Sequence, residues 1–314
     1  MNFSIAQLRY LIALDRHRNY VRAAESCYVT QPTMSMQIKK LENELGVVLF
    51  DRSKKPLMPT AIGEKTISKA RAVLAEVAGI EDMISEYRDR IAGELKLGVI
   101  PSVSPYLIPR FLGTFADKFP EVKLEIRELL TENLIEQLRR GNIDIGIMVT
   151  PLDEEGILEI PLYYERMLVY VHKDHPFSEL DSLRLDEVNT EDLWLMSQGN
   201  CFRSQVLNLC ASQNPLIRDK QVYYESGSLE TIKRLIESEG GWTIVPELAV
   251  DDYLSDRVAV RRIEEPSPLR EVSLVYSRYQ SKQRLIGFLK EEIRESIPKK
   301  MLEKDRGTVV EWNT

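Results

Sequence analysis

The chain has 314 residues, of which 43% are hydrophobic and 29% charged, and its formal net charge is −7. This is about twice the length of a typical domain, so two or more domains are expected, and the composition argues against a disordered chain. Its apolar runs are far shorter than the roughly 18 residues of a membrane span, and the N-terminus lacks a secretion signal. We therefore expect a cytoplasmic protein with no membrane partner. Three cysteines cannot build a disulfide framework, and the Cys and His residues lack zinc-site spacing, so neither a metal nor a cofactor is predicted.

Basic residues are concentrated at the N-terminal end. Residues 1–60 carry nine Lys and Arg against five Asp and Glu, a local charge of +4, whereas the remaining residues carry −11. A basic segment on an acidic body is typical of a nucleic-acid-binding module, although a solvated surface explains the same charges. Charge alone leaves both interpretations open.

The N-terminal residues have the pattern of a small helical domain. Apolar residues at helical spacing predict helices over residues 4–16, 20–28 and 31–45, with Thr30 as the N-cap of the third helix and Gly46 at its end. Two short helices joined by a tight connection describe a helix-turn-helix, whose second helix fits the major groove of DNA. A generic small helical bundle is the alternative interpretation.

The third helix and the segment that follows it carry the residues expected to contact double-stranded DNA. Residues 50–56 predict a basic hairpin, or wing, placed to reach phosphates beside the groove. We expect base contacts from Gln31, Thr33, Ser35 and Met36, phosphate contacts from Lys39, Lys40 and Arg52, and further contacts from Pro32 and Lys54.

A long helix is predicted over residues 60–90. At 1.5 Å per residue it would be roughly 45 Å long, and its apolar stripe exceeds what one small domain can cover. The stripe consists of Ile67, Ala70, Leu74, Val77 and Ile80. We expect the same helix of a second copy to cover it, and the alternative is packing against the chain's own C-terminal body.

From about residue 93 the apolar pattern changes to short alternating runs separated by helical segments. This alternation predicts an α/β body with mostly parallel strands, which binds ligands in a crevice at the carboxyl ends of its strands. The strand candidates are residues 95–99, 123–129, 143–149, 168–171, 242–245 and 272–276, and the helix candidates are residues 107–118, 132–140, 229–238 and 281–297.

The N-terminal motif resembles that of LysR-type transcriptional regulators. The matching residues are Ala23-Ala24, Val29-Thr30-Gln31-Pro32-Thr33, Leu41-Glu42, Leu45-Gly46, Leu49-Phe50-Asp51-Arg52 and Thr60-Ala61-Ile62-Gly63. The resemblance covers nearly the whole chain, short of the last dozen residues. It implies a non-enzymatic activator that binds promoter DNA as a homodimer, with dimers expected to pair, and that acts on RNA polymerase.

The same resemblance implies a domain organisation. A winged helix-turn-helix is expected over residues 1–59, a linker and dimerisation helix over 60–92 and a regulatory domain over 93–301. That domain would have two α/β lobes like those of periplasmic binding proteins, one over about residues 93–165 and 267–301 and the other over about 166–266. Residues 302–314 are expected to form a polar tail.

A second segment resembles the peroxide-sensing branch of that family. It consists of Gly199-Asn200-Cys201-Phe202-Arg203-Ser204-Gln205 followed by Leu209-Cys210, with the same cysteine spacing, and residues 97–109 and 228–231 are also similar. The sequence departs from the branch at Asn200, Ser102 and Ser204, where His, Thr and Asp are common. The resemblance implies an oxidative-stress regulator that senses hydrogen peroxide through a reversible Cys201–Cys210 disulfide.

This disulfide conflicts with the structure predicted for the segment. Phe202, Val206 and Leu209 recur at helical spacing, and an intact helix would separate the two cysteine Cα atoms by roughly 13.5 Å. A disulfide needs less than about 7 Å. Oxidation must therefore unwind the segment, which makes it a two-state switch.

The expected roles follow from position. Cys201 is the peroxide-reactive thiolate, because a helix N-terminus and the nearby Arg203 favour the charged form, and Cys210 is the resolving thiol. Ser102 and Asn200 are candidates to hydrogen-bond peroxide, and the resemblance implies Arg270 as a weaker candidate to assist the thiolate. Cys27 is expected to serve packing alone.

Two other functions compete with this interpretation. One is a LysR-type regulator gated by a small organic effector in the lobe crevice, which needs no cysteines. The other is a thiol peroxidase fused to a helix-turn-helix. A cysteine-independent response would favour the first, and continuous peroxide consumption would favour the second.

Overall fold

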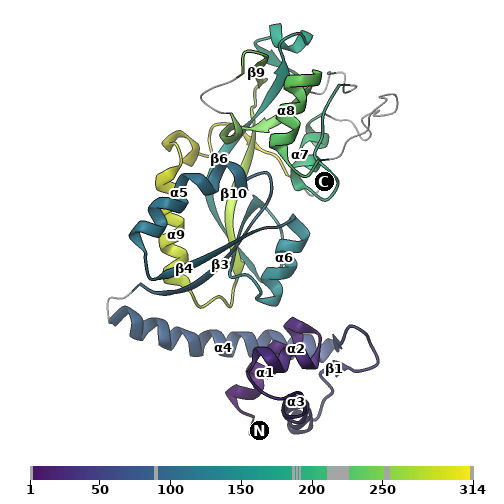
Figure 1. Ribbon diagram of the computed structural model, residues 1–314, viewed down its shortest axis with the longest axis vertical. Helices are drawn as coiled ribbons and strands as arrows, with labels where there is room; N and C mark the ends of the chain where they lie inside the picture. Colours follow the sequence, from purple (N-terminus) through teal and green to yellow (C-terminus); the bar gives the residue numbers. More distant parts are fainter. Residues whose placement is uncertain are drawn as a thin grey trace. The chain divides into compact units, whose positions relative to one another are not determined.

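The structure, a computed structural model, describes residues 3–87, 91–185, 188, 190, 192–210, 226–250 and 255–311 (Figure 1). The chain divides into two compact units. One is built on residues 1–91, with the short stretches 139–142 and 277–284 grouped with it, and the other on the remaining residues. Among the helices described, none is both long and apolar enough to cross a membrane.

The first unit is a winged helix-turn-helix followed by a long helix. Its elements are α1 (Ile5–His17), α2 (Tyr20–Ser26), α3 (Gln31–Leu45), β1 (Phe50–Asp51), β2 (Met58–Pro59) and α4 (Ala61–Tyr87). The predicted wing is confirmed, because β1 pairs with β2 in antiparallel register, with Phe50 opposite Pro59.

Local sequence accounts for the helix boundaries of this unit. The Thr30 side chain accepts a hydrogen bond from the Thr33 amide as N-cap of α3, and Gly46 ends that helix with a φ of 68°. α2 ends two residues before the predicted boundary, because Cys27 is its C-cap and Tyr28 follows with a φ of 56°. The apolar faces meet in one core that includes Leu11, Met34 and Ile38.

The apolar stripe of α4 is only partly uncovered. Ile67 and Ala70 are buried in the core of the first unit, and Leu74 packs against that core. The expectation that the whole stripe lacks a cover is therefore wrong for these positions, because α4 packs against α1 of its own domain. Among the side chains of α4 that the structure describes, the exposed large apolar ones are Ile62, Val73, Ile80 and Ile84.

The second unit is a two-lobed α/β body. Its strands are β3 (Gly93–Val99), β4 (Val122–Glu128), β5 (Ile145–Thr150), β6 (Ile157–His172), β7 (Ser182–Leu183), β8 (Trp242–Pro246), β9 (Val258–Ile263), β10 (Pro268–Ser277) and β11 (Thr308–Val309). Its helices are α5 (Ser104–Lys118), α6 (Thr131–Arg140), α7 (Cys201–Leu209), α8 (Leu229–Glu239) and α9 (Gln283–Ser296), with short 3₁₀ turns η1 (Pro176–Glu179), η2 (Glu247–Ala249) and η3 (Lys299–Leu302).

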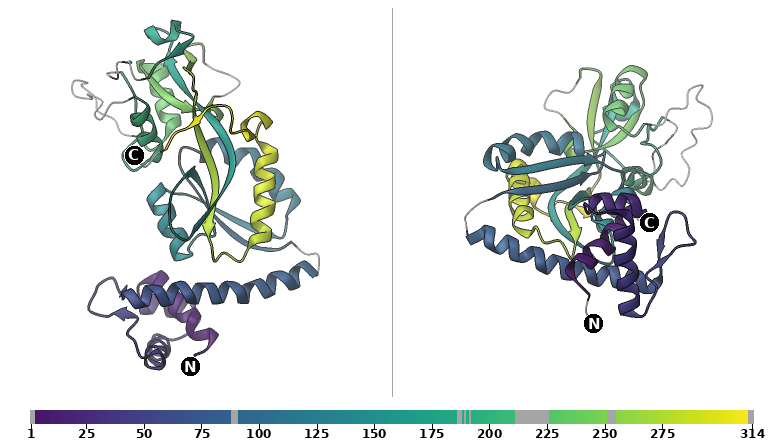
Figure 2. Two further views of the ribbon diagram at one scale, coloured as in Figure 1. Left: turned by 180° about the vertical axis from the view of Figure 1, so that it is seen from behind. Right: turned by 60° about the horizontal axis from the view of Figure 1, so that its bottom comes forward.

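The sheet of this unit is mixed. β3 pairs in parallel with both β4 and β5, as the alternating pattern predicts. β8 and β9 pair with β6 in antiparallel register, and β5 pairs with β10 in the same way. The prediction of mostly parallel strands is therefore wrong for the second lobe, because both β8 and β9 run antiparallel to β6. β6 is a 16-residue strand that forms the centre of this part of the sheet (Figures 1 and 2).

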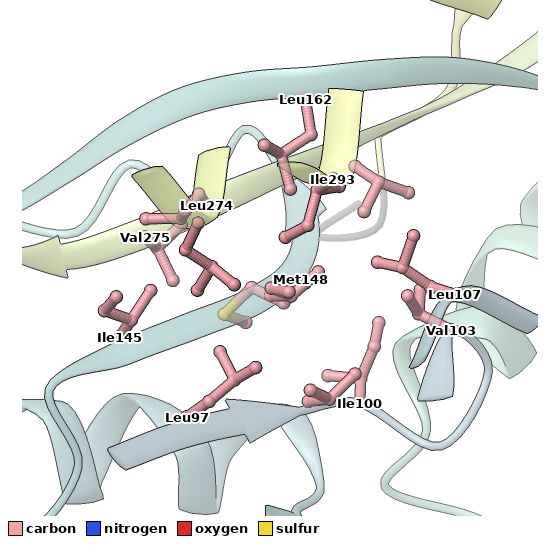
Figure 3. Packing of buried hydrophobic residues seen from close by; sticks show 14 of the residues in the cluster. Leu97, Ile100, Val103, Leu107, Ile145, Met148, Leu162, Leu274, Val275 and Ile293 are labelled. Atoms are coloured by element: carbon pink, nitrogen blue, oxygen red, sulfur yellow. The ribbon is translucent and has the colours of Figure 1, made fainter. Parts of the chain in front are cut away.

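Each lobe has its own hydrophobic core. The core of the first lobe contains Leu97, Ile100, Val103 and Met148 at the carboxyl ends of β3 and β5 and in the turn after β3, with Ile293 of α9 (Figure 3). The core of the second lobe contains Val169 of β6 and Trp242 and Ile244 of β8. β6 contributes to both cores, because Leu162 and Tyr163 lie in the first.

The last part of the chain is more structured than the description of a polar tail implies. Residues 308 and 309 form β11, which extends the sheet in parallel register beside Pro268 and Leu269 of β10. Val310 packs against the core of the second lobe.

Candidate functional site

The predicted DNA-contacting residues share the outer side of α3 and the wing. Met34, Ile38 and Leu41 form the fully buried face of this helix. Gln31, Pro32, Met36, Lys39 and Lys40 are exposed, as are Arg52 and Lys54, whereas Thr33 and Ser35 are half-buried. Their contacts with DNA stay a prediction.

Glu42 connects α3 to the wing. Its carboxylate accepts hydrogen bonds from the Leu49 amide at 2.9 Å and the Phe50 amide at 3.4 Å, and its other oxygen pairs with Arg52 at 2.9 Å. The sequence suggests no role for Glu42 beyond its place in the family motif. The ion pair with Glu42 holds the Arg52 guanidinium beside α3.

The two cysteines of the predicted switch lie at opposite ends of α7. Cys201 is the first residue of the helix and Cys210 is its C-cap, and both are buried free thiols. Cys201 belongs to the core of the first lobe, whereas Phe202, Val206 and Cys210 belong to the core of the second. The predicted helix is confirmed, and of its predicted apolar face Phe202 and Val206 are buried whereas Leu209 is half-buried.

Two hydroxyl side chains lie at the edge of the first lobe that holds Cys201. Ser102 follows β3 and Thr131 begins α6 after β4, and these strands are parallel neighbours, so the two turns lie at one edge of the sheet. Ile100 and Val103, on either side of Ser102, share the Cys201 core. The hydroxyls of Ser102 and Thr131 are buried and lack a hydrogen-bond partner among the described residues.

Arg270 supplies the positive charge of this site. It lies on β10, is fully buried, and its guanidinium carbon is 4.9 Å from the centre of the Phe202 ring. The guanidinium makes an ion pair with the buried Glu165 at 3.4 Å, but its nitrogens donate no hydrogen bond to any described residue. Burial raises the pKa of Glu165 to about 6, and Arg270 opposes that shift.

Opposing influences act on the Cys201 thiol. Burial raises its pKa, while the Thr131 hydroxyl, the Arg270 charge and the amides of Phe202 and Cys201 lower it without overcoming burial. The Thr131 contact acts although it falls outside ordinary hydrogen-bond geometry. Burial alone raises the pKa of Cys210 to about 12. Of the two thiols, Cys201 is the one with groups that stabilise a thiolate.

Asn200 and Arg203 are engaged elsewhere. The Asn200 amide donates to the Ser197 carbonyl at 3.0 Å and to the Ser197 hydroxyl at 3.1 Å, and Arg203 donates to the Met196 carbonyl at 2.9 Å. The sequence predicted that Arg203 would assist the thiolate more than Arg270. The structure shows the reverse, because Arg270 is the arginine that lowers the Cys201 pKa.

Thr131 is the site residue that sequence reasoning missed. The sequence could have indicated it, because Thr131 follows a predicted strand of the first lobe, at the carboxyl edge where such folds bind ligands.

Cys27 is not part of this site. It belongs to the first unit, where its sulfur contacts the Ser26 hydroxyl at 3.9 Å. Within the described ranges, no group of three His, Cys, Asp or Glu side chains could hold a metal ion.

Comparisons with known proteins give the class to which this geometry belongs. The family profile "Bacterial regulatory helix-turn-helix protein, lysR family" matches residues 5–64, and "LysR substrate binding domain" matches residues 88–297. The chain belongs to the LysR family. It is therefore a DNA-binding transcriptional regulator rather than an enzyme.

Within that family the chain is similar to OxyR proteins. It is 35% identical over 274 residues to the DNA-binding transcriptional dual regulator OxyR of Escherichia coli, covering 87% of this chain and 89% of that protein. It is 34% identical to the hydrogen peroxide-inducible genes activator of Dickeya chrysanthemi, with the same coverage. A full-length OxyR variant from Pseudomonas aeruginosa superposes with a TM-score of 0.77 at 34% identity, covering 93% of this chain and 98% of that one. The hydrogen peroxide-bound form of an OxyR mutant from Corynebacterium glutamicum gives a TM-score of 0.59 at 27% identity, covering 94% and 93%.

Proposed function

We propose that this regulator senses hydrogen peroxide by forming a reversible disulfide between Cys201 and Cys210. The observation that carries the proposal is the surroundings of Cys201. Thr131 and Arg270 act on this buried thiol, and Ser102 lies at the same edge of the first lobe; all three have donors without a hydrogen-bond partner among the described residues. Cys201 begins the helix whose C-cap is Cys210. Buried donors without partners call for an explanation, and a small polar molecule that accepts hydrogen bonds supplies one.

The chemistry proceeds in two balanced steps. The Cys201 sulfur, as thiolate, attacks one oxygen of peroxide, so an S–O bond forms and the O–O bond breaks. The departing hydroxide takes up the proton that the thiol gave up and leaves as water. The Cys210 thiol then attacks the sulfenic sulfur of Cys201, so the S–S bond forms and the S–O bond breaks, and the departing hydroxyl takes the Cys210 proton and leaves as a second water. Cytosolic thiols can reduce the Cys201–Cys210 disulfide again by thiol–disulfide exchange.

The roles of the neighbouring residues follow from where they lie. In this proposal Arg270 and Thr131 stabilise negative charge on the sulfur and on the departing oxygen, and the Ser102 hydroxyl donates a hydrogen bond to the peroxide. Asn200 and Arg203 hold the turn before α7 through Ser197 and Met196 rather than contacting peroxide in the reduced form.

Oxidation changes the structure because the bond and the helix exclude each other. An intact α7 holds the two Cα atoms roughly 13.5 Å apart, about twice the limit for a disulfide. Closing the bond must also withdraw residues 202–209 from the second lobe, where Phe202 and Val206 are 1% exposed. The regulatory domain, over residues 93–301, then passes this change to the DNA-binding domain.

The remaining partners complete the proposal. We expect the outer residues of α3 and the wing to bind double-stranded promoter DNA in the cytoplasm, and Val73, Ile80 and Ile84 of α4 to pack against a second copy. Dimers are expected to pair, and RNA polymerase is the expected downstream partner.

A peroxide titration tests the proposal. The wild-type protein should consume about one equivalent of peroxide per chain until it is reduced again, and Cys27→Ser should behave identically. Cys201→Ser should consume none by this route, and Cys210→Ser should yield a sulfenic acid that a dimedone-type reagent traps at Cys201. Continuous consumption would indicate a peroxidase, and a peroxide response that survives Cys201→Ser would refute the proposal.

A further inference from the structure

The C-terminal segment, residues 307–311, is anchored firmly to β10. The Thr308 amide donates to the Ser267 carbonyl at 2.9 Å, and the Val310 amide donates to the Leu269 carbonyl at 2.9 Å. Gly307 permits this approach, because a Cβ there would lie within 2.0 Å of the Ser267 oxygen. The segment therefore has a defined position on the sheet.

Arg306 fixes the chain immediately before this segment. Its guanidinium donates to both carboxylate oxygens of Glu247, at 3.0 and 2.9 Å, and to the Tyr164 carbonyl at 3.3 Å. The Arg306 side chain is only 12% exposed. These contacts tie the chain just before the segment to η2 and β6, which lie outside the stretch between Cys201 and Cys210.

The C-terminal segment contacts α7, the helix that the proposed disulfide would unwind. The C-terminal segment lies beside this helix (Figure 1), and the Gln205 amide donates to the Val310 carbonyl at 3.0 Å. The Asn208 amide donates to the Glu311 carbonyl at 3.5 Å. Gln205 is fully buried and its own carbonyl oxygen has no partner among the described residues. Losing this hydrogen bond would leave the buried Gln205 amide without a polar partner, which is costly in free energy.

We propose that the C-terminal segment is a positioning element that holds α7 in the reduced conformation through Gln205. The inference rests on the proposed Cys201–Cys210 disulfide. Gln205 lies near the middle of the segment between the two cysteines and Asn208 near its end, so closing the bond displaces both from Val310 and Glu311. Reduction of the disulfide restores the contact. The C-terminal segment thereby shifts the equilibrium between dithiol and disulfide toward the dithiol.

The test compares the redox equilibrium of full-length and altered chains in glutathione buffers, with the disulfide counted by peptide mass. One chain ends after Gly307, and its matched control ends after Glu311 and keeps the contact. A third protein carries Gln205→Met, which preserves side-chain length but removes the amide. A fourth combines Gln205→Met with the chain that ends after Gly307.

The equilibrium constant for disulfide formation should rise about tenfold in Gln205→Met and in the chain ending after Gly307, as the loss of one buried hydrogen bond from the reduced state alone implies. The control ending after Glu311 should match the full chain. Gln205→Met should add little to the shorter chain, since the partner carbonyl is already gone.

The outcomes separate the two proposals. If no Cys201–Cys210 disulfide forms in the full-length protein, the proposed function and this inference both fail. If the disulfide forms but Gln205→Met leaves the equilibrium unchanged, the inference alone is overturned, because the contact would then persist equally in both states. Should the chain ending after Gly307 not fold, Gln205→Met decides the question.

Discussion

Glu165 and Arg270 form a buried ion pair, with 3.4 Å between the carboxylate and guanidinium atoms and at most 1% of either side chain exposed. The pair joins β6 to β10 at the point where Arg270 also lies over the ring of Phe202, next to Cys201. Burying two charges is costly unless each is well paired. The Arg270 nitrogens donate no hydrogen bond to any described residue. They therefore remain able to bind a second negatively charged group.

Arg270 should matter more for peroxide reactivity than Arg203. Arg270→Met removes a charge that lowers the Cys201 pKa, so that pKa should rise further and the rate of reaction with peroxide at neutral pH should fall severalfold, because less of the thiol is ionised. Thiolate absorbance measured against pH gives the first quantity and stopped-flow kinetics the second.

Arg203→Met is the matched control. Because its guanidinium bonds the Met196 carbonyl, the substitution should loosen the turn before α7 but leave the Cys201 titration nearly unchanged. Equal shifts in the two variants would contradict the assignment of Arg270.

Glu165 should make stability depend on pH in a particular direction. Its folded pKa of about 6 lies above the ordinary 4.5, so the folded state binds the proton more tightly than the unfolded state. Its contribution is fully present below about pH 4.5 and is lost as the pH rises through about 6, by about 2 kcal/mol. Glu165→Gln fixes the neutral form. The unfolding free energy of wild type minus that of Glu165→Gln should therefore fall across this window in urea titrations, and a constant or rising difference would count against the buried carboxyl.

The sequence predicted the elements of the DNA-binding domain well, because periodicity and capping are local properties. Thr30, Gly46 and the buried face through Met34 and Ile38 lie as the pattern requires. It failed for α4, where covered and uncovered positions alternate along one helix. Whether Leu74 is covered depends on where α1 packs, and no local pattern contains that information.

The site was predicted unevenly for a similar reason. The apolar spacing was sufficient to predict the helix between Cys201 and Cys210, and the family resemblance drew attention to the two cysteines. Thr131, at the start of α6, and Arg270, on β10, are distant from Cys201 in sequence, and only the tertiary fold brings them to it. Arg203 looked better than Arg270 because it is near in sequence, yet its position on α7 directs it to Met196.

Ile80 should be a contact between two copies. It is 55% exposed on α4 and lies on the same helix face as Val73 and Ile84. Ile80→Glu should weaken dimerisation by at least about tenfold, because a charge would enter an apolar interface. Sedimentation across a concentration series measures this. Leu74→Ala, which alters the domain's own packing, should lower the thermal midpoint without dissociating the dimer, and a still-dimeric Ile80→Glu would place the interface elsewhere.

Arg52 should contribute a phosphate contact. Arg52→Ala should weaken binding about equally for all DNA sequences and reduce the slope of log affinity against log salt by about one. Glu42→Gln should weaken binding by a smaller factor, because it releases Arg52 from its orientation without removing the charge. Lys123→Ala, an exposed lysine of the regulatory body, serves as the control. An unchanged salt slope for Arg52→Ala would remove the wing from the interface.

Hydrogen exchange across residues 198–210, in reduced protein and in peroxide-treated protein with the disulfide verified by mass, tests the central claim most directly. The account predicts that the amides of α7 are protected when Cys201 and Cys210 are free thiols and exchange rapidly once the two are bonded, because the helix and the bond exclude each other. Cys201→Ser should keep the protected pattern under peroxide. Equal protection in both redox states, with the Cys201–Cys210 bond present, would contradict the switch.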